Sequence, residues 1–191
     1  MRENVKKKME ELERPTIEEF RNMEKVPLIV VLDDVRSMNN VGSIFRTCDA
    51  FLVEQVCLCG ITAVPPHPDI HKTALGAEDS VEWSYFKDVC EAIRDLKSRG
   101  YKICAVEQAK QSVTLDEFLI KEVTTSVEGV DKPKGYAVIF GNEVKGVSQQ
   151  AIDISDCCIE LPQYGTKHSL NVSVTAGILI YNMYSLLSTL K

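Results

Sequence analysis

Three polar segments, far apart in the sequence, carry the side chains best suited to chemistry. Glycine in such segments lets backbone approach a ligand closely, and asparagine and serine offer hydrogen bonds without net charge. Each segment adjoins an apolar run that indicates a buried strand, so the three could enclose one pocket. They are Asn40–Arg46 (NVGSIFR), Phe140–Gly146 (FGNEVKG) and Leu161–Ser173 (LPQYGTKHSLNVS).

In the first segment, Gly42 and Arg46 are four residues apart and would share one face of a helix. We expect Gly42 to keep that face open in front of Arg46. The guanidinium needs a partner, either a buried carboxylate or a ligand phosphate, whose geometry its planar fork matches. Asn40 is well placed to cap the same helix.

The second segment lacks both the Gly-Lys-Ser/Thr ending of a Walker loop and the Gly-x-Gly-x-x-Gly pattern. Glu143, at a strand end, could accept a hydrogen bond from a ligand hydroxyl or from Arg46. The alternative is a turn that only starts the next helix.

In the third segment, Ser169 and Asn171 flank Leu170 at the start of the last helix, where they could bind a ligand or cap the helix. His168 is a conceivable general base because histidine is a common one, although simple exposure is the favoured interpretation.

The elements that must position these segments alternate between strand and helix, which predicts an α/β fold with a parallel sheet covered by helices on both faces. The segment 60–69 holds three prolines and is expected to be irregular, and 126–135 is expected to be a turn-rich connection. Strands are predicted at 27–32, 55–59, 101–106, 136–140 and 158–161, and helices at 41–51, 88–99, from Thr114, at 148–154 and at 170–190.

Residues 1–25 form a charged arm, predicted to be helical and interrupted at Pro15, with Thr16 capping its second helix. Residues 26–191 are expected to form one domain. The arm could bind substrate through Lys6, Lys7 and Lys8, but a solvated or packing helix is favoured.

Composition limits the partners. The net charge is −6, and the arm is neutral, so the rest of the chain holds the whole excess of acid. Since nonspecific nucleic-acid binders are usually basic, any nucleic-acid contact must use local patches.

Seven cysteines without a Cys-x-x-Cys pair favour reduced thiols in the cytoplasm and no metal site. The charged start predicts no signal peptide, and polar residues in the last helix argue against a membrane span. We expect that helix to pack on the sheet and on another subunit.

Taken together, the motifs resemble the SpoU (TrmH-like) branch of the SPOUT methyltransferases, which act on RNA. The stretch from Pro65 to Ala77 also looks like that family, and the resemblance covers roughly residues 27–187. The residues that carry it are Asn40, Gly42 and Arg46, then Gly141, Glu143 and Gly146, then Pro162 and the run Ser169–Ser173.

This resemblance implies an α/β domain with a deep C-terminal trefoil knot, in a homodimer whose active sites are completed across the interface. It also implies S-adenosylmethionine as cofactor, and transfer of its methyl group to a ribose 2′-hydroxyl in tRNA or rRNA, with tRNA slightly preferred. A binding protein without turnover and a small-molecule methylase remain as alternatives. The implied cofactor-binding residues are Val106, Gly141, Leu161 and Leu170, and the implied catalytic residues are Arg46, Asn40, Glu143, Ser169 and Asn171.

Overall fold

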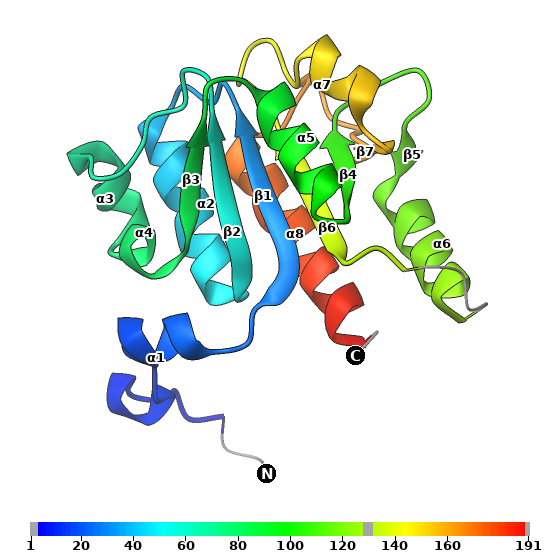
Figure 1. Cartoon of the computed structure of the whole chain (residues 1–191). Coiled ribbons are helices and arrows are strands. Elements are labelled where there is room, and N and C mark those ends of the chain that lie inside the picture. Colours follow the sequence, from blue (N-terminus) through cyan, green and yellow to red (C-terminus); the bar gives the residue numbers. More distant parts are fainter. Residues whose placement is uncertain (1–3, 128–131, 190–191) are drawn as a thin grey trace.

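The computed structural model describes residues 4–127 and 132–189, and Figure 1 shows their arrangement. Within those residues a seven-stranded sheet has the order β3-β2-β1-β6-β4-β7-β5, and every neighbouring pair runs parallel. The parallel sheet expected from the sequence is confirmed. The strands are β1 (Val26–Asp33), β2 (Val53–Cys59), β3 (Trp83–Phe86), β4 (Tyr101–Val106), β5 (Val113–Thr114), β6 (Gly135–Phe140) and β7 (Cys157–Glu160).

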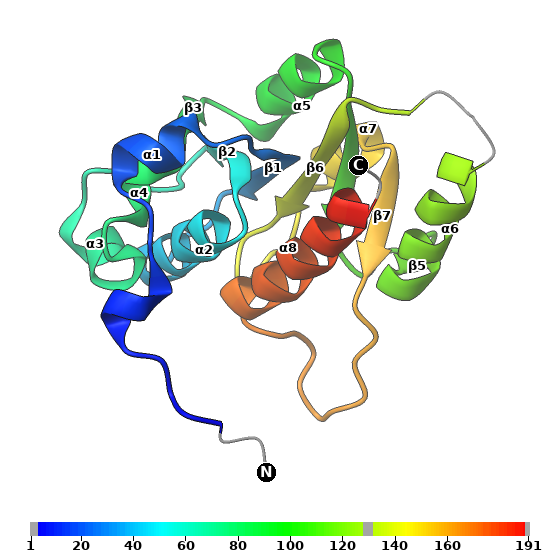
Figure 2. The ribbon, with the colours of Figure 1, turned by 90° about the horizontal axis from the view of Figure 1, so that it is seen from below.

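Helices cover both faces of the sheet, as predicted. Helices α2 and α8 lie side by side on one face, and α5 and α7 lie on the other (Figures 1 and 2). A short 3-10 helix, Met9–Leu12, precedes them all. The α-helices are α1 (Ile17–Asn22), α2 (Met38–Ala50), α3 (Pro68–Ala74), α4 (Ala77–Ser80), α5 (Val89–Ser98), α6 (Leu115–Val127), α7 (Gln149–Ile154) and α8 (Val172–Thr189).

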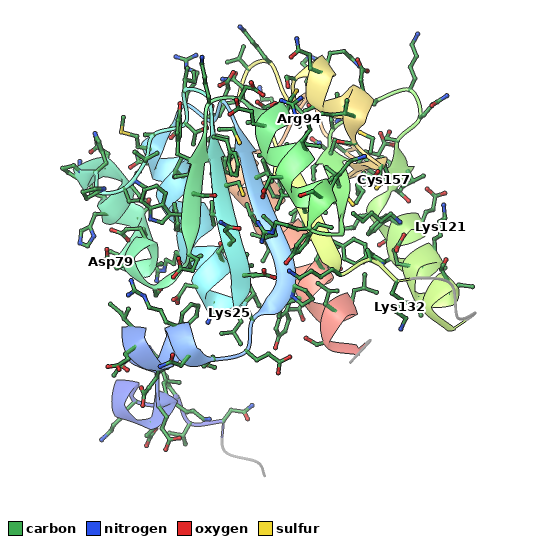
Figure 3. The ribbon with its side chains drawn as sticks, viewed as in Figure 1. Lys25, Asp79, Arg94, Lys121, Lys132 and Cys157 are labelled. Atoms are coloured by element: carbon green, nitrogen blue, oxygen red, sulfur yellow. The ribbon has the colours of Figure 1, made fainter. Side chains whose placement is uncertain are left out.

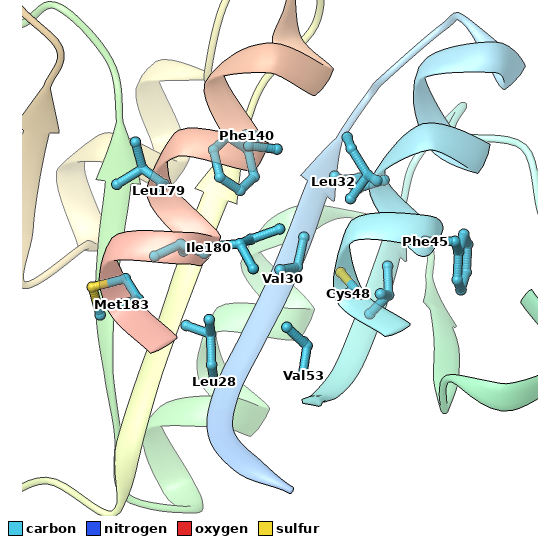
Figure 4. Packing of buried hydrophobic residues seen from close by; sticks show 14 of the residues in the cluster. Leu28, Val30, Leu32, Phe45, Cys48, Val53, Phe140, Leu179, Ile180 and Met183 are labelled. Atoms are coloured by element: carbon cyan, nitrogen blue, oxygen red, sulfur yellow. The ribbon is translucent and has the colours of Figure 1, made fainter. Parts of the chain in front are cut away.

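Strand β1 lies at the centre of the fold and is apolar on both faces. Leu28, Val30 and Leu32 pack towards α2 and α8, as Figure 4 shows. Ile29 and Val31 point the other way and pack with α5 and α7. Because both faces are covered, the strand has no solvent-facing position, which explains its unbroken β-branched and aliphatic run.

The segment from Gly60 to Lys87 differs most from the sequence prediction. Two helices, α3 and α4, and the edge strand β3 lie in it, and none of them was predicted. The irregular segment ends at His67 rather than residue 69, because Pro68 occupies the first position of α3, where a missing N–H costs nothing. His67 caps this helix by accepting a hydrogen bond from the Asp69 amide at 3.2 Å.

Two helices that carry candidate residues start elsewhere than predicted. Helix α2 begins at Met38, three residues early, because Ser37 is its cap and accepts from the Asn40 amide at 3.3 Å. The prediction that Asn40 caps this helix is therefore wrong. Helix α8 begins at Val172 instead of residue 170, and its predicted end at Leu190 lies outside the described residues.

The arm is partly anchored to the domain. Thr16 caps α1 as predicted, accepting from the Glu19 amide at 3.2 Å, and Phe20 on that helix is buried. Arg21 donates to the Asp79 carbonyl oxygen at 2.6 Å, which ties α1 to α4.

The helix predicted from Thr114 is confirmed as α6, which extends to Val127. That end enters the connection expected to be turn-rich, of which 128–131 lie outside the described residues.

Candidate active site

One cleft of about 510 Å³ opens where β4, β6 and β7 end. Its walls come from the residues after β4, from the loop after β6 and from the loop that joins β7 to α8. Ligands of parallel α/β sheets bind at this edge because the loops after neighbouring strands meet there. The lining residues are Val106, Glu107, Gln108, Phe140 to Gly146, Ile159 to Leu161, Gln163, His168 to Val172 and Thr175.

The second and third motifs supply most of this cleft. All four expected cofactor residues, Val106, Gly141, Leu161 and Leu170, line it. Among the expected catalytic residues, Glu143, Ser169 and Asn171 also line it, whereas Asn40 and Arg46 lie on α2, outside the lining.

Glu143 holds the start of α2 against the loop after β6. Its carboxylate accepts from the Arg36 amide at 3.0 Å, the Ser37 amide at 2.9 Å and the Asn40 side-chain amide at 2.9 Å. Burial alone would raise the pKa of Glu143, but these hydrogen bonds outweigh it and lower the pKa below its ordinary value. Glu143 is therefore a carboxylate that is already engaged inside the protein.

The same network continues from Asn40 to the third motif. The side-chain amide of Asn171 donates a hydrogen bond to Asn40 Oδ1 at 3.2 Å. Asn171 Oδ1 in turn accepts from the Ser173 backbone amide at 2.8 Å, so Asn171 caps α8, one of the two roles considered for it. The chain Glu143–Asn40–Asn171 thus joins one residue from each of the three motifs. Figure 1 shows how far apart in sequence their elements lie.

Arg46 has neither of the carboxylate partners that the sequence suggested for it. It is exposed on α2, and in the described part of the chain it forms neither a hydrogen bond nor an ion pair. The ion pair with Glu143 is therefore absent there, as is the buried carboxylate. Gly42 does not keep space open for Arg46 either. A Cβ at Gly42 would collide with the Ile70 carbonyl and the Thr73 hydroxyl, so this glycine lets α3 pack closely on α2.

Glu107 was missed in the sequence. It accepts from the Val147 amide at 2.9 Å and from the Gln108 amide at 2.9 Å, and so links the end of β4 to the loop after β6. Gly146, at φ +70°, turns its backbone towards this carboxylate so closely that a Cβ would collide with it. The sequence did contain a signal for Glu107, because this acidic residue directly follows the strand predicted at 101–106.

The lining suits an uncharged or cationic organic ligand better than a metal. The lining combines apolar side chains such as Ile159 and Leu161 with the carboxylates of Glu107, Glu143 and Glu160. Among the described residues, no group of three or more histidine, cysteine or acidic side chains could hold a metal ion. In the same residues, no helix is long and apolar enough to cross a membrane. All seven cysteines are free.

Known proteins resemble this chain in sequence and in fold. The sequence profile described as the SpoU rRNA Methylase family matches residues 27–181, most of the chain and all three motifs. The chain belongs to the SpoU family. The match begins just after the arm, so the SpoU domain includes the cleft, α2 and most of α8.

Individual SpoU relatives agree in sequence and fold. The tRNA (guanosine(18)-2′-O)-methyltransferase of Thermus thermophilus is 32% identical over 90% of this chain and 81% of its own length. The 23S rRNA (guanosine-2′-O-)-methyltransferase RlmB of Neisseria meningitidis is 26% identical over 84% of this chain and 59% of its own length. The crystal structure of the A. aeolicus TrmH/SpoU tRNA modifying enzyme superposes with a TM-score of 0.73, at 28% identity over 91% of this chain and 81% of that one.

Proposed function

We propose that this SpoU protein is an S-adenosylmethionine-dependent methyltransferase that modifies a ribose 2′-hydroxyl in tRNA or rRNA. The observation that carries the proposal is the hydrogen-bonded chain Glu143–Asn40–Asn171, which joins the three motifs at the edge of one cleft. The relatives named above act on tRNA and on rRNA, and the 32% identical one acts on tRNA. We therefore slightly favour tRNA.

The cleft fits the cofactor that this reaction needs. Its volume of about 510 Å³ lies in the range of small-molecule sites, and Leu161, Leu170 and Val106 offer apolar contacts beside the Gly141 backbone. The nearby carboxylates of Glu107 and Glu160 favour a ligand with positive charge. S-adenosylmethionine supplies a methyl group made electrophilic by its sulfonium. The four residues that would hold it are Val106, Gly141, Leu161 and Leu170.

Arg46 is the residue we assign to the RNA. A guanidinium stays protonated in proteins, so this side chain cannot act as a base near neutral pH. It can clamp an RNA phosphate through two parallel hydrogen bonds and stabilise the negative charge that forms as the 2′-hydroxyl loses its proton to phosphate or water. Asn40 and Glu143 would orient the start of α2, and Ser169 and Asn171 would bound the ribose side of the cleft.

A second subunit would complete this site. Arg46 does not line the cleft of its own chain, and α8 exposes an apolar stripe of Val174, Ile178 and Tyr181 at helical spacing. We propose a symmetric dimer in which α8 and part of α2 are buried and each Arg46 serves the partner's cleft.

The family fold further implies a trefoil knot in the C-terminal half. The cysteine pattern favours a reducing compartment, so we place the activity in the cytoplasm.

The proposal can be tested with RNA from a strain that lacks this gene. The purified protein and methyl-labelled S-adenosylmethionine should label that RNA at linkages that resist alkaline hydrolysis, because a 2′-O-methyl group prevents attack on the phosphate. Arg46→Ala should lower turnover by about 10² or more, while cofactor affinity and melting temperature stay unchanged. Arg94→Ala is the matched control, since Arg94 is exposed on α5, on the other face of the sheet (Figure 3).

Label confined to small molecules would instead support a small-molecule methylase. Cofactor binding without labelling of any RNA would support a binding protein. A loss of stability in Arg46→Ala would assign Arg46 a structural role.

A further inference from the structure

Tyr164 is the most exposed large apolar or aromatic side chain of the cleft loops. It lies in the loop that joins β7 to α8, and 96% of its surface is accessible to solvent. Nothing in the described residues gives it a hydrogen bond or a ring contact. Yet its neighbour Gln163 lines the cleft, and so does His168 further along the same loop. The loop that forms this wall of the cleft therefore also presents an exposed aromatic ring to solvent.

The loop that carries this ring has basic side chains and no acidic ones. Between Leu161 and Asn171 the loop carries Lys167 and His168 and no acidic residue, in a chain whose net charge is −6. Across the cleft, the loop after β6 exposes Lys145. The carboxylate next to it, Glu143, is occupied by three N–H donors. Each of the two loops thus contributes a lysine, Lys167 from the loop of Tyr164 and Lys145 from the loop after β6.

Val144 completes the surface on the opposite wall. Its side chain is 78% exposed and lies between Glu143 and Lys145 in the cleft lining. We call the group Val144, Lys145, Tyr164 and Lys167 the cleft rim. An exposed ring with lysines nearby matches the way proteins bind unpaired nucleotides, in which the ring stacks on a base and the cations contact phosphates.

We propose that the cleft rim binds an unstacked nucleotide of the RNA substrate, with the base stacked on Tyr164 and its phosphates near Lys145 and Lys167. The inference rests on the proposed function and adds a residue that selects a flexible or extruded target. A ribose inside a regular duplex presents no free base face, so a stacking residue at the mouth favours nucleotides in loops.

The test measures binding rather than turnover. The probe is a fluorescently labelled single-stranded oligoribonucleotide of mixed sequence, and its affinity for the full chain is followed by anisotropy at several salt concentrations. Tyr164→Ala should weaken binding by about 5- to 150-fold, the range for loss of one base–aromatic stack. Tyr164→Phe should bind like the wild type, since it keeps the ring.

The salt dependence of binding distinguishes stacking on Tyr164 from the phosphate contact of Lys167. Tyr164→Ala should leave the slope of log affinity against log salt unchanged, because stacking releases no counterion. Lys167→Ala should reduce that slope by about 0.7, the value for one phosphate contact on a single strand. Tyr85→Ala, on edge strand β3 far from the cleft in the sheet order, is the control and should change neither quantity.

Three results would overturn the inference. They are unchanged oligonucleotide affinity in Tyr164→Ala, loss of S-adenosylmethionine affinity by calorimetry in that variant, or its dissociation into monomers by light scattering. The last two would assign the ring to the cofactor or to a partner subunit. A different result would separate the two proposals. If Tyr164→Ala weakens oligonucleotide binding but the wild-type protein methylates no RNA, the proposed function is refuted and the assignment of the cleft rim stands.

Discussion

Removal of the Glu143 carboxylate is expected to detach the start of α2 from the loop after β6. In Glu143→Ala the Arg36 and Ser37 amides lose a partner but remain open to water, since both contacts lie at the surface. The Asn40 side chain is different. Its residue is only 9% exposed, so its amide has little access to replacement water.

The difference in burial between these donors determines how much stability Glu143→Ala should lose. One hydrogen bond to a charged acceptor, made by a largely buried donor, contributes about 1.5–3 kcal/mol, and exposed ones contribute much less. We therefore expect Glu143→Ala to lower the free energy of unfolding by about 2 kcal/mol. For a chain of this length, that loss corresponds to a fall in melting temperature of roughly 4–8 °C.

The loss should depend on pH with a defined sign. The folded-state pKa of Glu143 is lowered, so its contribution is fully present above the unfolded-state pKa of about 4.3. It is lost as the pH falls through the folded-state value. The difference in stability between wild type and Glu143→Gln, which cannot ionise, should be constant near neutrality and shrink below about pH 4.

Thermal unfolding followed by circular dichroism, at one fixed protein concentration, measures both effects. Glu160→Gln is a suitable control, because Glu160 also lines the cleft but accepts from Ser112 and does not contact α2. Equal melting temperatures for wild type and Glu143→Ala at neutral pH would refute the reasoning. A stability difference between wild type and Glu143→Gln that does not change with acid would show that the carboxylate charge is not what holds α2.

Three further outcomes are expected. Gly146→Ala should cost about 1–2 kcal/mol or more in denaturant unfolding, from its left-handed backbone and its collision with Glu107, whereas Gly165→Ala, with open space around it, should not. Removal of residues 1–14 should weaken RNA binding and flatten a salt slope equivalent to about three to five phosphate contacts; an unchanged slope would mean that the arm only packs. Ile178→Lys should give inactive monomers by light scattering, and an active dimer would contradict the proposed interface.

The sequence alone was sufficient for the class of fold and for the identity of the motifs. The unbroken apolar run of β1 predicts a strand buried on both faces, and strand and helix alternation predicts a parallel sheet. The sequence analysis predicted neither α3 nor α4. Pro68 at the first position of α3 resembles a helix breaker until the cap at His67 is seen. Helix starts were also displaced, since several polar residues near Ser37 could serve as the cap.

Tertiary structure decided how the candidate residues act. Spacing placed Gly42 and Arg46 on one face, but only the packing of α3 shows that Gly42 serves a helix contact. The sequence left two partners open for Glu143, a ligand hydroxyl and Arg46. The folded chain instead brings Glu143 to Asn40, which is 103 positions away, and leaves Arg46 exposed. Local sequence determines periodicity and capping because those depend on near neighbours. Which polar groups meet across a cleft depends on how distant strands are ordered in the sheet, and that order is settled only when the whole core packs.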